Sequence, residues 1–342
     1  MRLAAAALVL VSACGATQPA PAAAPDPIEG QLPDGRSVRL VIDGDRIAAI
    51  DAVPEVAGSS WLWPTIVDSH VHLVYWPVAD KLASTGIGVA VDLAAPERTL
   101  VTGDSRGIHL IAAGPMLTRT RGYPLDSWGV DGYGAGCAEA ACVTQTIDRL
   151  AASGARVIKI ALDENGLPPA LLEAAVTAAH GKQLRVAVHA LSDASAALAA
   201  RAGVDLLAHT PIEPLSDTTV AAWSKGAVVS TLAAFGGSPG AVDNLRRLRA
   251  AGATVLYGTD LGNTRDAGPS AEELSLLRDA GLDDAAITAA MTTVPLAYWK
   301  LPLEALSPGS EATLLVLARD PRTDATALLD ARGVYLRGQR LR

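Results

Sequence analysis

His70 and His72 stand one residue apart in the stretch PTIVDSHVHLV, residues 64–74. Side chains at positions i and i+2 of a β-strand point to the same face, so a strand here would place both imidazoles and the Asp68 carboxyl on one side. Two imidazoles from one strand can bind a metal ion if other elements supply the remaining ligands. Taken alone, such a pair is more often structural than metal-binding.

Three further residues of metal-ligating type each end a separate predicted strand. His189 ends LRVAVH, His209 ends VDLLAH and Asp260 ends TVLYGTD. In a barrel of parallel strands, the C-terminal strand ends meet at one mouth, where catalytic residues collect. A hydrogen-bonded core imidazole would explain either histidine alone, but ligand types at the ends of three strands favour a metal site.

Lys159 is one of only five lysines and is flanked by isoleucines in RVIKIAL. A buried ammonium is costly without a partner, and burial lowers the pKa of a lysine. A neutral amine can react with carbon dioxide to form a carbamate, whose oxygens can bridge two metal ions. The alternative is an ion pair with a nearby carboxylate such as Asp163.

The elements that would position these residues repeat along the chain. Short β-branched runs alternate with Ala- and Leu-rich helical stretches, which is typical of parallel strands buried on both faces. Eight such strand segments occur between residues 64 and 300: PTIVDSHVH, GIGVAVDLA, GIHLIAAG, ARVIKIAL, LRVAVHA, VDLLAHT, GAVVSTL and ATVLYGTD. The pattern predicts an α/β fold, a (β/α)8 TIM barrel. The rival, an open doubly wound sheet, would usually carry a G-x-G-x-x-G turn, which is absent here.

Both flanks of the barrel segment are predicted to form strands. Residues 28–63 contain a hairpin pattern with Asp43-Gly44 as its turn, and residues 301–342 contain SEATLLVLARDP and GVYLRGQRLR. We therefore expect the two chain ends to form one small β-sandwich domain beside the barrel.

The N-terminus has the pattern of an export signal. Arg2 precedes a short apolar run, and VSAC resembles a lipobox, which predicts a signal peptide over residues 1–13 and lipidation of Cys14. A Pro/Ala-rich tether follows to residue 27. The prediction is a membrane-anchored lipoprotein facing the periplasm or the cell surface; an ordinary cleaved signal peptide is the alternative.

Composition limits the partners. The chain has 342 residues, 50% of them hydrophobic, with a mean hydropathy of +0.27, so a sizeable core is available. A net charge of −8 and the lack of a Lys/Arg-rich block argue against a nucleic-acid partner.

Cys137 and Cys142 could pair in an oxidising compartment if the segment between them is not helical, or remain free thiols. The oligomeric state is left open.

The motifs DSHVHL, GARVIKI, VAVHA, VDLLAH and YGTDLG, in this order, resemble the amidohydrolase superfamily. They are most similar to its binuclear, carboxylated-lysine branch, which includes imidazolonepropionase-like proteins and Xaa-Pro dipeptidases. The resemblance runs from about residue 38 to the end. It implies two divalent metal ions, with zinc expected. The implied ligands are His70, His72 and Asp260 for one ion, His189 and His209 for the other, and carboxylated Lys159 as the bridge.

The same resemblance implies a reaction. A metal-bridging hydroxide would attack an amide carbonyl, with Asp260 as the catalytic proton carrier, in a small substrate such as a dipeptide or an N-acyl amino acid. The alternatives are a mononuclear cyclic-amide hydrolase or deaminase, and a lipoprotein that binds a ligand without turnover. Ser192 stands where deaminases carry an acidic residue, which argues against deamination.

Two regions depart from the family pattern. The loop TRTRGYPLDSWG replaces a Gly-Gly-His run, and in it Arg121 and Tyr123 could bind a substrate carboxylate or be ordinary loop residues. The segment TTVPLAYWKL lacks the usual Asn-Pro-Ala, which affects helix packing more than chemistry. His109 and His180 lie away from the strand ends that would bear ligands.

Overall fold

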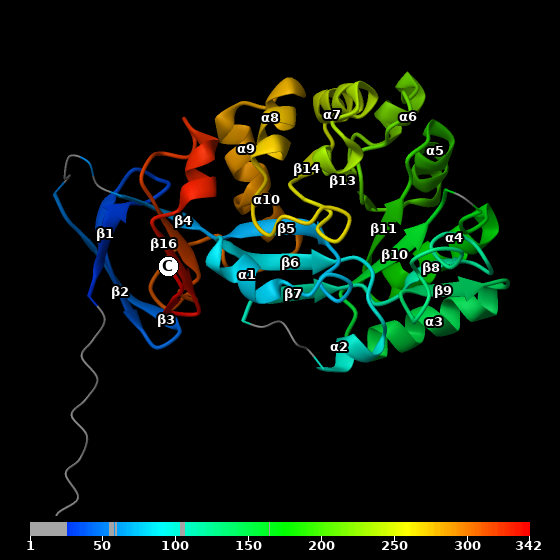
Figure 1. Ribbon diagram of the computed structural model, residues 1–342, viewed down its shortest axis with the longest axis horizontal. Coiled ribbons are helices and arrows are strands. Elements are labelled where there is room, and N and C mark those ends of the chain that lie inside the picture. Colours follow the sequence, from blue (N-terminus) through cyan, green and yellow to red (C-terminus); the bar gives the residue numbers. More distant parts are fainter. Residues whose placement is uncertain (1–25, 55–57, 59, 103–106, 164) are drawn as a thin grey trace, which may run out of the picture.

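The computed structural model describes residues 26–54, 58, 60–102, 107–163 and 165–342. Helices flank a region of parallel strands, and a separate sheet lies at one end of the molecule (Figure 1). The predicted signal peptide and Cys14 lie outside the described residues. In the described part of the chain, none of the helices has the length and apolarity needed to cross a bilayer.

The parallel strands form two sheets. The first contains β5 (Ile66–Val71), β6 (Ile87–Asp92) and β7 (His109–Ala112). The second follows the order β14-β13-β12-β11-β10-β8-β9, and every pair in it is parallel. Its strands are β8 (Met116–Arg119), β9 (Gly134–Cys137), β10 (Val157–Ala161), β11 (Arg185–His189), β12 (Leu206–Leu207), β13 (Ala227–Val229) and β14 (Thr254–Leu256).

Backbone hydrogen bonds link both outer strands of the first sheet, β5 and β7, to the second sheet. Ser69 N donates to Tyr257 O at 2.9 Å, beside β14, and Arg156 N donates to Ala112 O at 3.0 Å, beside β7. The predicted barrel is therefore seen as two adjoining parallel sheets rather than one continuous sheet of eight strands. The break between β7 and β8 falls at Gly114, with a φ of 73°, and Pro115, which has no N–H to give to a ladder.

Helices and loops cover the strands. The helices are α1 (Ala79–Ser84), α2 (Arg98–Thr102), α3 (Ala140–Ala152), α4 (Pro169–Gly181), α5 (Asp193–Ala202), α6 (Asp217–Ala222), α7 (Pro239–Ala251), α8 (Ala271–Asp279), α9 (Asp284–Met291), α10 (Thr293–Tyr298), η1 (Ala233–Phe235) and η2 (Ala325–Asp330). Ser192 caps α5 by accepting a hydrogen bond from Ser195 N, and Gly203 ends that helix in the left-handed region.

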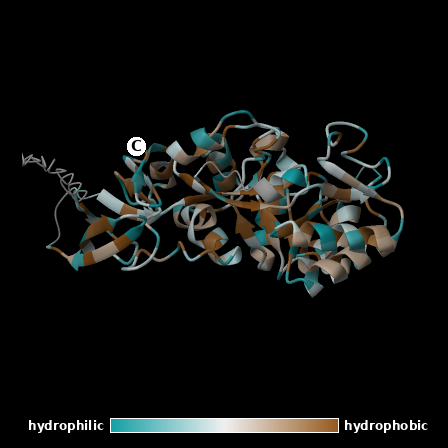
Figure 2. Cartoon of the chain, turned by 90° about the horizontal axis from the view of Figure 1, so that it is seen from below, coloured by the Kyte–Doolittle hydropathy of each residue, from teal (hydrophilic) through white to brown (hydrophobic). Residues whose placement is uncertain are grey.

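The core follows from burial of the strands on both faces. Every residue of β5, β6 and β10 is buried, including the polar ones. Figure 2 shows the apolar residues along the central strands and the hydrophilic ones mainly on the surrounding helices and loops. Burial of each Val, Leu or Ile side chain contributes about 1.5–3 kcal/mol, so the strand interior stabilises the frame that carries the polar residues.

Both chain ends contribute to the remaining sheet, which has the order β17-β16-β15-β4-β1-β2-β3. Its strands are β1 (Ile28–Gln31), β2 (Ser37–Asp43), β3 (Arg46–Ala52), β4 (Ser60–Pro64), β15 (Leu314–Leu317), β16 (Gly333–Leu336) and β17 (Gln339–Arg340). Strand β4 pairs with β1 in parallel and with β15 in antiparallel orientation. The predicted β-sandwich is thus seen as one mixed sheet, and the predicted domain limits stay a prediction.

Candidate metal centre

Strand β5 carries the first of two imidazoles, and the second follows the strand directly, so both lie at its C-terminal end. His70 is fully buried, and His72, directly after the strand, is 5% exposed. Asp68, which was expected on the same face of the strand, does not join the two imidazoles. Its carboxylate accepts hydrogen bonds from Thr259 N (3.0 Å), Thr259 Oγ1 (2.5 Å) and His70 N (3.2 Å), so it ties β5 to the segment after β14.

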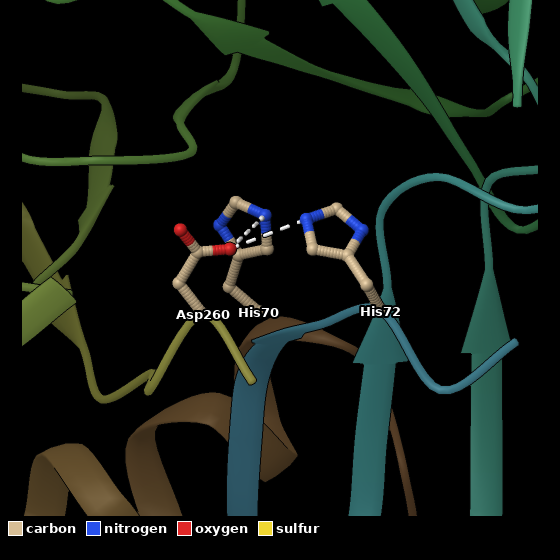
Figure 3. Close-up of side chains that lie close together, drawn as sticks. All are labelled: His70, His72 and Asp260. Carbon is tan, nitrogen blue, oxygen red and sulfur yellow. Dashed lines mark ion pairs between the residues drawn. The ribbon is translucent and has the colours of Figure 1, made fainter. Parts of the chain in front are cut away.

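Asp260 lies opposite the two imidazoles. Its Oδ1 is 3.2 Å from His72 Nε2 and 3.5 Å from His70 Nε2 (Figure 3). One potential ligand atom from each of these residues falls within 4.8 Å of the other two. Nitrogen and oxygen donors at this separation suit a divalent ion such as zinc.

Hydrogen bonds orient these donor atoms. His70 Nδ1 lies 2.8 Å from Ala208 O, and because a carbonyl only accepts, Nδ1 must carry the hydrogen and Nε2 the lone pair. Asn263 Nδ2 donates to Asp260 Oδ2 at 2.7 Å, which leaves Oδ1 directed at the imidazoles. Within the described residues, His70 Nε2 and Asp260 Oδ1 are buried without a hydrogen-bond partner. Such orphaned atoms fit a bound cation.

Two further histidines extend the cluster. The ring centre of His209, which follows β12, lies 4.4 Å from that of His70, and His189, at the end of β11, lies 5.0 Å from His209. His209 Nδ1 is 3.2 Å from Thr231 Oγ1. Burial, reinforced by neighbouring charges, lowers the pKa of His209 well below its usual range and that of His189 to about 4. Both rings are therefore neutral, the form that binds metals.

Lys159 lies in the middle of β10 and is fully buried. Burial lowers the pKa of its amine to about 7, although the charge of Asp260 acts in the opposite direction. Nζ has no hydrogen-bond partner among the described residues. The alternative of an ion pair with Asp163 is not observed, because that carboxylate accepts hydrogen bonds from Leu191 N, Ser192 Oγ and Ser195 Oγ at 2.5–3.0 Å.

The charge of Asp260 is maintained by its neighbours. Burial by itself would raise the pKa of this carboxyl. The positive charges that His70 and His209 carry when protonated, and the hydrogen bond and charge of His72, act more strongly in the other direction, so the pKa lies well below its usual range. An ionised carboxylate beside neutral imidazoles is a suitable donor set for a divalent cation.

Asp92 is a site residue that was not predicted. It ends β6 and is fully buried, and its carboxylate accepts hydrogen bonds from Leu73 N (3.0 Å), Val74 N (3.4 Å) and Ala94 N (3.2 Å). Burial raises its pKa to about 6, against the effect of the His72 charge. It fixes the chain that follows His72. A polar residue at the end of an apolar strand, the signal that identifies His189, would also have identified Asp92.

The two predicted substrate residues have different surroundings. The ring of Tyr123 lies 4.8 Å from that of His189, and its hydroxyl accepts a hydrogen bond from Trp128 Nε1 at 3.0 Å. Arg121 is exposed, with a left-handed φ of 64°. In the described part of the chain, it has no hydrogen bond or ion pair to a histidine of the cluster. The structure therefore brings Tyr123, but not Arg121, against the candidate centre.

The two histidines outside the cluster have structural partners. His109 Nε2 is 2.7 Å from Glu311 Oε1, and His180 Nε2 is 2.9 Å from Asp205 Oδ2. Each pair joins a residue of the parallel-strand region to a distant segment of the chain.

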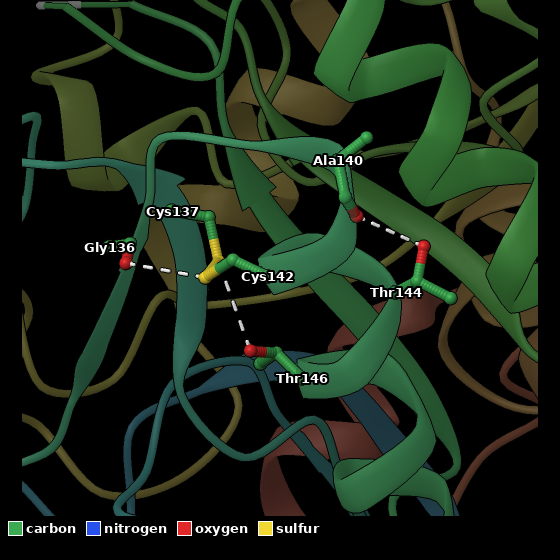
Figure 4. The surroundings of a disulfide bond; sticks show 6 residues. All are labelled: Gly136, Cys137, Ala140, Cys142, Thr144 and Thr146. Carbon is green, nitrogen blue, oxygen red and sulfur yellow. Dashed lines mark hydrogen bonds between the residues drawn. A yellow bond between two sulfur atoms is a disulfide. The ribbon is translucent and has the colours of Figure 1, made fainter.

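The cysteines also form a structural contact. Cys137, at the end of β9, and Cys142, in the first turn of α3, form a disulfide with a Cα–Cα distance of 5.5 Å (Figure 4). The junction between strand and helix supplies the non-helical geometry that pairing requires. Thr146 Oγ1 lies 3.8 Å from Cys137 Sγ.

Comparison with known proteins places the fold. No protein-family model matches the chain. An uncharacterised protein of Mycobacterium tuberculosis is 25% identical over 358 residues, covering 90% of this chain and 93% of the relative.

Solved structures match over most of the chain. A Xaa-Pro dipeptidase with methionine bound in its active site has a TM-score of 0.77 at 18% identity, covering 92% of this chain and 99% of the dipeptidase. An amidohydrolase has a TM-score of 0.72 at 20% identity, covering 91% of this chain and 97% of its own. The protein therefore has the fold of these amidohydrolase-like and Xaa-Pro dipeptidase-like proteins.

Proposed function

We propose that the protein is a metal-dependent hydrolase that cleaves the amide C–N bond of a small substrate, with dipeptides and N-acyl amino acids as the substrate classes. The observation that supports this most is the cluster of His70 Nε2, His72 Nε2 and Asp260 Oδ1, in which His70 Nε2 and Asp260 Oδ1 are buried without a hydrogen-bond partner among the described residues, as is Lys159 Nζ on β10. The cluster lies in a fold shared with Xaa-Pro dipeptidases and amidohydrolases.

For the architecture, we propose that the two parallel sheets act as one (β/α)8 barrel. Strands β7 and β8 then serve as two halves of a single interrupted strand, which with β5, β6 and β10–β14 makes eight. The hydrogen bonds from both outer strands of the first sheet to the second sheet support this proposal. Ligands on β5, β10, β11 and β12 and in the segment after β14 would then share the C-terminal mouth.

In the proposed centre, His70, His72 and Asp260 would hold one divalent ion and His189 and His209 would hold a second. Carboxylated Lys159 would supply further oxygen ligands. We expect zinc, because imidazole nitrogen and carboxylate oxygen are its ordinary ligands. When bound, the two ions supply a nucleophile at neutral pH and polarise the scissile carbonyl.

The protein residues then have separate tasks. The carbonyl of Ala208 fixes the tautomer of His70, so that Nε2 remains a lone-pair donor. Asn263 anchors Oδ2 of Asp260, so that Oδ1 stays directed at the imidazoles, and the carboxylate takes the proton of the attacking water and passes it to the leaving nitrogen. A carboxylate with a low pKa gives this proton up readily, as the second transfer requires.

Metal analysis and a substrate screen test this proposal together. After reconstitution with zinc or manganese and bicarbonate, we expect about two ions per chain and hydrolysis of members of a dipeptide and N-acyl amino acid library. Lys159→Met should lose at least one ion and reduce activity by about a hundredfold or more. The matched control is Lys225→Met, because Lys225 is exposed.

The alternatives predict different results. A mononuclear cyclic-amide hydrolase or deaminase would keep its activity in Lys159→Met. A lipoprotein that binds a ligand without turnover would show no hydrolysis of any library member. Wild-type protein that takes up no metal after reconstitution contradicts the proposed function.

We also propose that the protein is exported and held at a membrane by a lipid on Cys14, which the VSAC pattern supports. In cells fed a labelled fatty acid, the wild-type chain should carry label and sediment with membranes. Cys14→Ser should lose both properties. A variant that keeps the label contradicts this assignment.

A further inference from the structure

Aromatic side chains gather beside the histidine cluster, although the whole chain has only six tryptophans, six tyrosines and one phenylalanine. The ring centre of Trp128 lies 5.3 Å from that of His72, and Tyr123 lies 4.8 Å from His189. Two proposed ligands on different strands are therefore in direct contact with aromatic rings from the loop after β8.

Two more rings continue this surface outward. Tyr75 lies 5.8 Å from Trp128 and 5.8 Å from Tyr133, and Trp128 lies 6.1 Å from Tyr133, measured between ring centres. We call Tyr75, Trp128 and Tyr133 the aromatic wall. Its members come from the loop after β5 and the loop before β9, so the fold brings them together.

The aromatic wall leaves apolar surface in contact with solvent. In the described part of the chain, the exposed large hydrophobic residues are Tyr75, at 42%, and Val130, at 52%, and Val130 lies in the same loop as Trp128. Trp128 and Tyr133 are half-buried. Exposed apolar side chains gathered beside a buried polar cluster are typical of a ligand-binding surface.

Trp128 is held in position by its own loop. Its Nε1 donates to the hydroxyl of Tyr123 at 3.0 Å. Gly129 N donates to Pro124 O at 2.7 Å, and Gly134 N donates to Gly129 O at 2.8 Å. An indole fixed in this way can stack on a ligand without first losing conformational freedom.

We propose that the aromatic wall binds an aromatic group of the substrate, and that Trp128 determines the preference for it. The inference rests on the proposed function and narrows its substrate class to amides that carry an aromatic ring near the scissile bond. The direct contact of Trp128 with His72 supports a substrate as the occupant, because a ring stacked there lies next to the donor atoms.

The test compares pairs of amides that differ in one ring. N-acetyl-L-phenylalanine is compared with N-acetyl-L-alanine, and N-benzoylglycine with N-acetylglycine, so that either side of the amide is sampled. In the metal-loaded wild type, kcat/KM should favour the aromatic member of at least one pair about tenfold. Trp128→Ala should abolish this preference, lowering kcat/KM for the aromatic member about tenfold more than for the aliphatic member.

Two variants separate ring stacking from loop disruption. Trp128→Phe keeps a ring but loses the hydrogen bond to Tyr123, so it should retain most of the preference. Tyr335→Ala, in β16 of the other sheet, is the control and should leave both rates unchanged. Equal rates on both members of each pair, or a Trp128→Ala variant that slows all four substrates alike, would overturn the proposal.

A binding measurement keeps this inference separate from the proposed function. If no amide is cleaved, the proposed function fails, and calorimetric titration with N-acetyl-L-phenylalanine and N-acetyl-L-alanine still tests the aromatic wall. The wild type should bind N-acetyl-L-phenylalanine about tenfold more tightly than N-acetyl-L-alanine. Loss of this difference in Trp128→Ala supports the proposed role of the aromatic wall. Equal or undetectable binding of both compounds to the wild type overturns it.

Discussion

Burial of the Lys159 amine without a partner is hard to explain by structure alone. A polar group removed from water without hydrogen bonds costs free energy, so an apolar residue of similar length would serve the fold better. The amine lies near the imidazoles of His70, His189 and His209 and the carboxylate of Asp260, which supports a functional reason for keeping it.

The first residue-scale prediction concerns stability without metal. In metal-free protein without bicarbonate, Lys159→Met should raise the free energy of unfolding by about 1–3 kcal/mol, because it removes the unpartnered amine. Urea denaturation measures this. Lys225→Met, at an exposed position, should change the value by no more than about 0.5 kcal/mol.

The difference in the free energy of unfolding between Lys159→Met and the wild type should depend on pH. The amine has a pKa of about 7 when folded, against a usual value of 10.5, so the unfolded chain binds more protons between these limits. Wild-type stability therefore increases with pH in this window, and the difference from Lys159→Met should shrink between about pH 7 and about pH 10. A difference that is constant with pH, or grows, would show that the amine is not buried as described.

At the scale of elements, the ends of the strands are fixed by buried carboxylates. Asp68 joins β5 to Thr259, and burial raises its pKa to about 7 although donors from Thr259 and His70 act against this. Asp92 holds the backbone after His72 from the end of β6. The ligands therefore lie on segments whose backbone position is set by hydrogen bonds, which favours a rigid site.

Gly262 provides an element-scale prediction. It has a φ of +124°, and a Cβ there would lie 2.7 Å from His72 Cβ, so Gly262→Ala should displace the imidazole. We expect a loss of about 1 kcal/mol of stability from the backbone and a 10- to 100-fold weaker metal affinity. Metal titration with a chromophoric chelator as competitor measures the affinity.

Gly309→Ala is the matched control. Gly309 also has a positive φ, of +87°, but a Cβ there would meet nothing within 4 Å. It should lose similar stability and keep the wild-type metal affinity. If both variants bind metal like the wild type, the packing of Gly262 on His72 does not position the ligand.

At the scale of the whole molecule, a polar contact joins the two regions of the fold. His109, in β7, lies 2.7 Å from Glu311, which precedes β15 of the end sheet. Burial alone would raise the pKa of Glu311, but hydrogen bonds from Thr313 and His109 and the charges of His109 and Arg337 lower it below its usual value. The ionised carboxylate therefore stabilises the contact between the parallel-strand region and the end sheet.

This contact predicts an acid dependence. Because the folded pKa of Glu311 is below its usual value of 4.5, its contribution is present above about pH 4.5 and is lost as the pH falls through the folded pKa. Wild type should therefore have a higher Tm than Glu311→Gln near about pH 6, and the two should converge in acid. The control Asp330→Asn, at a carboxylate that is 73% exposed, should match the wild type throughout. A gap between wild type and Glu311→Gln that widens in acid would contradict this role.

The sequence by itself determined eight of the ten strands of the parallel sheets and the polar residues at or just after their ends, but not β8 and β9, which are short and carry no β-branched run. All eight predicted strand segments contain parallel strands, because β-branched runs buried on both faces leave few alternatives. The same reasoning identified His70, His72, His189, His209 and Asp260, since a polar residue at the end of an apolar strand is conspicuous in the chain. The sequence also shows that the loop after β8 departs from the family pattern. It does not show which residues pack around this loop.

Only the tertiary structure decided how these segments meet. The division into two parallel sheets at Gly114 and Pro115, the hydrogen bonds that occupy Asp163, and the support from Asp92 depend on contacts between distant residues. The aromatic wall is the clearest case, because Tyr75 and Trp128 lie in separate loops whose paths no local pattern specifies. Periodicity reports which face of an element is buried, whereas the partner of that face is set by packing of the whole chain.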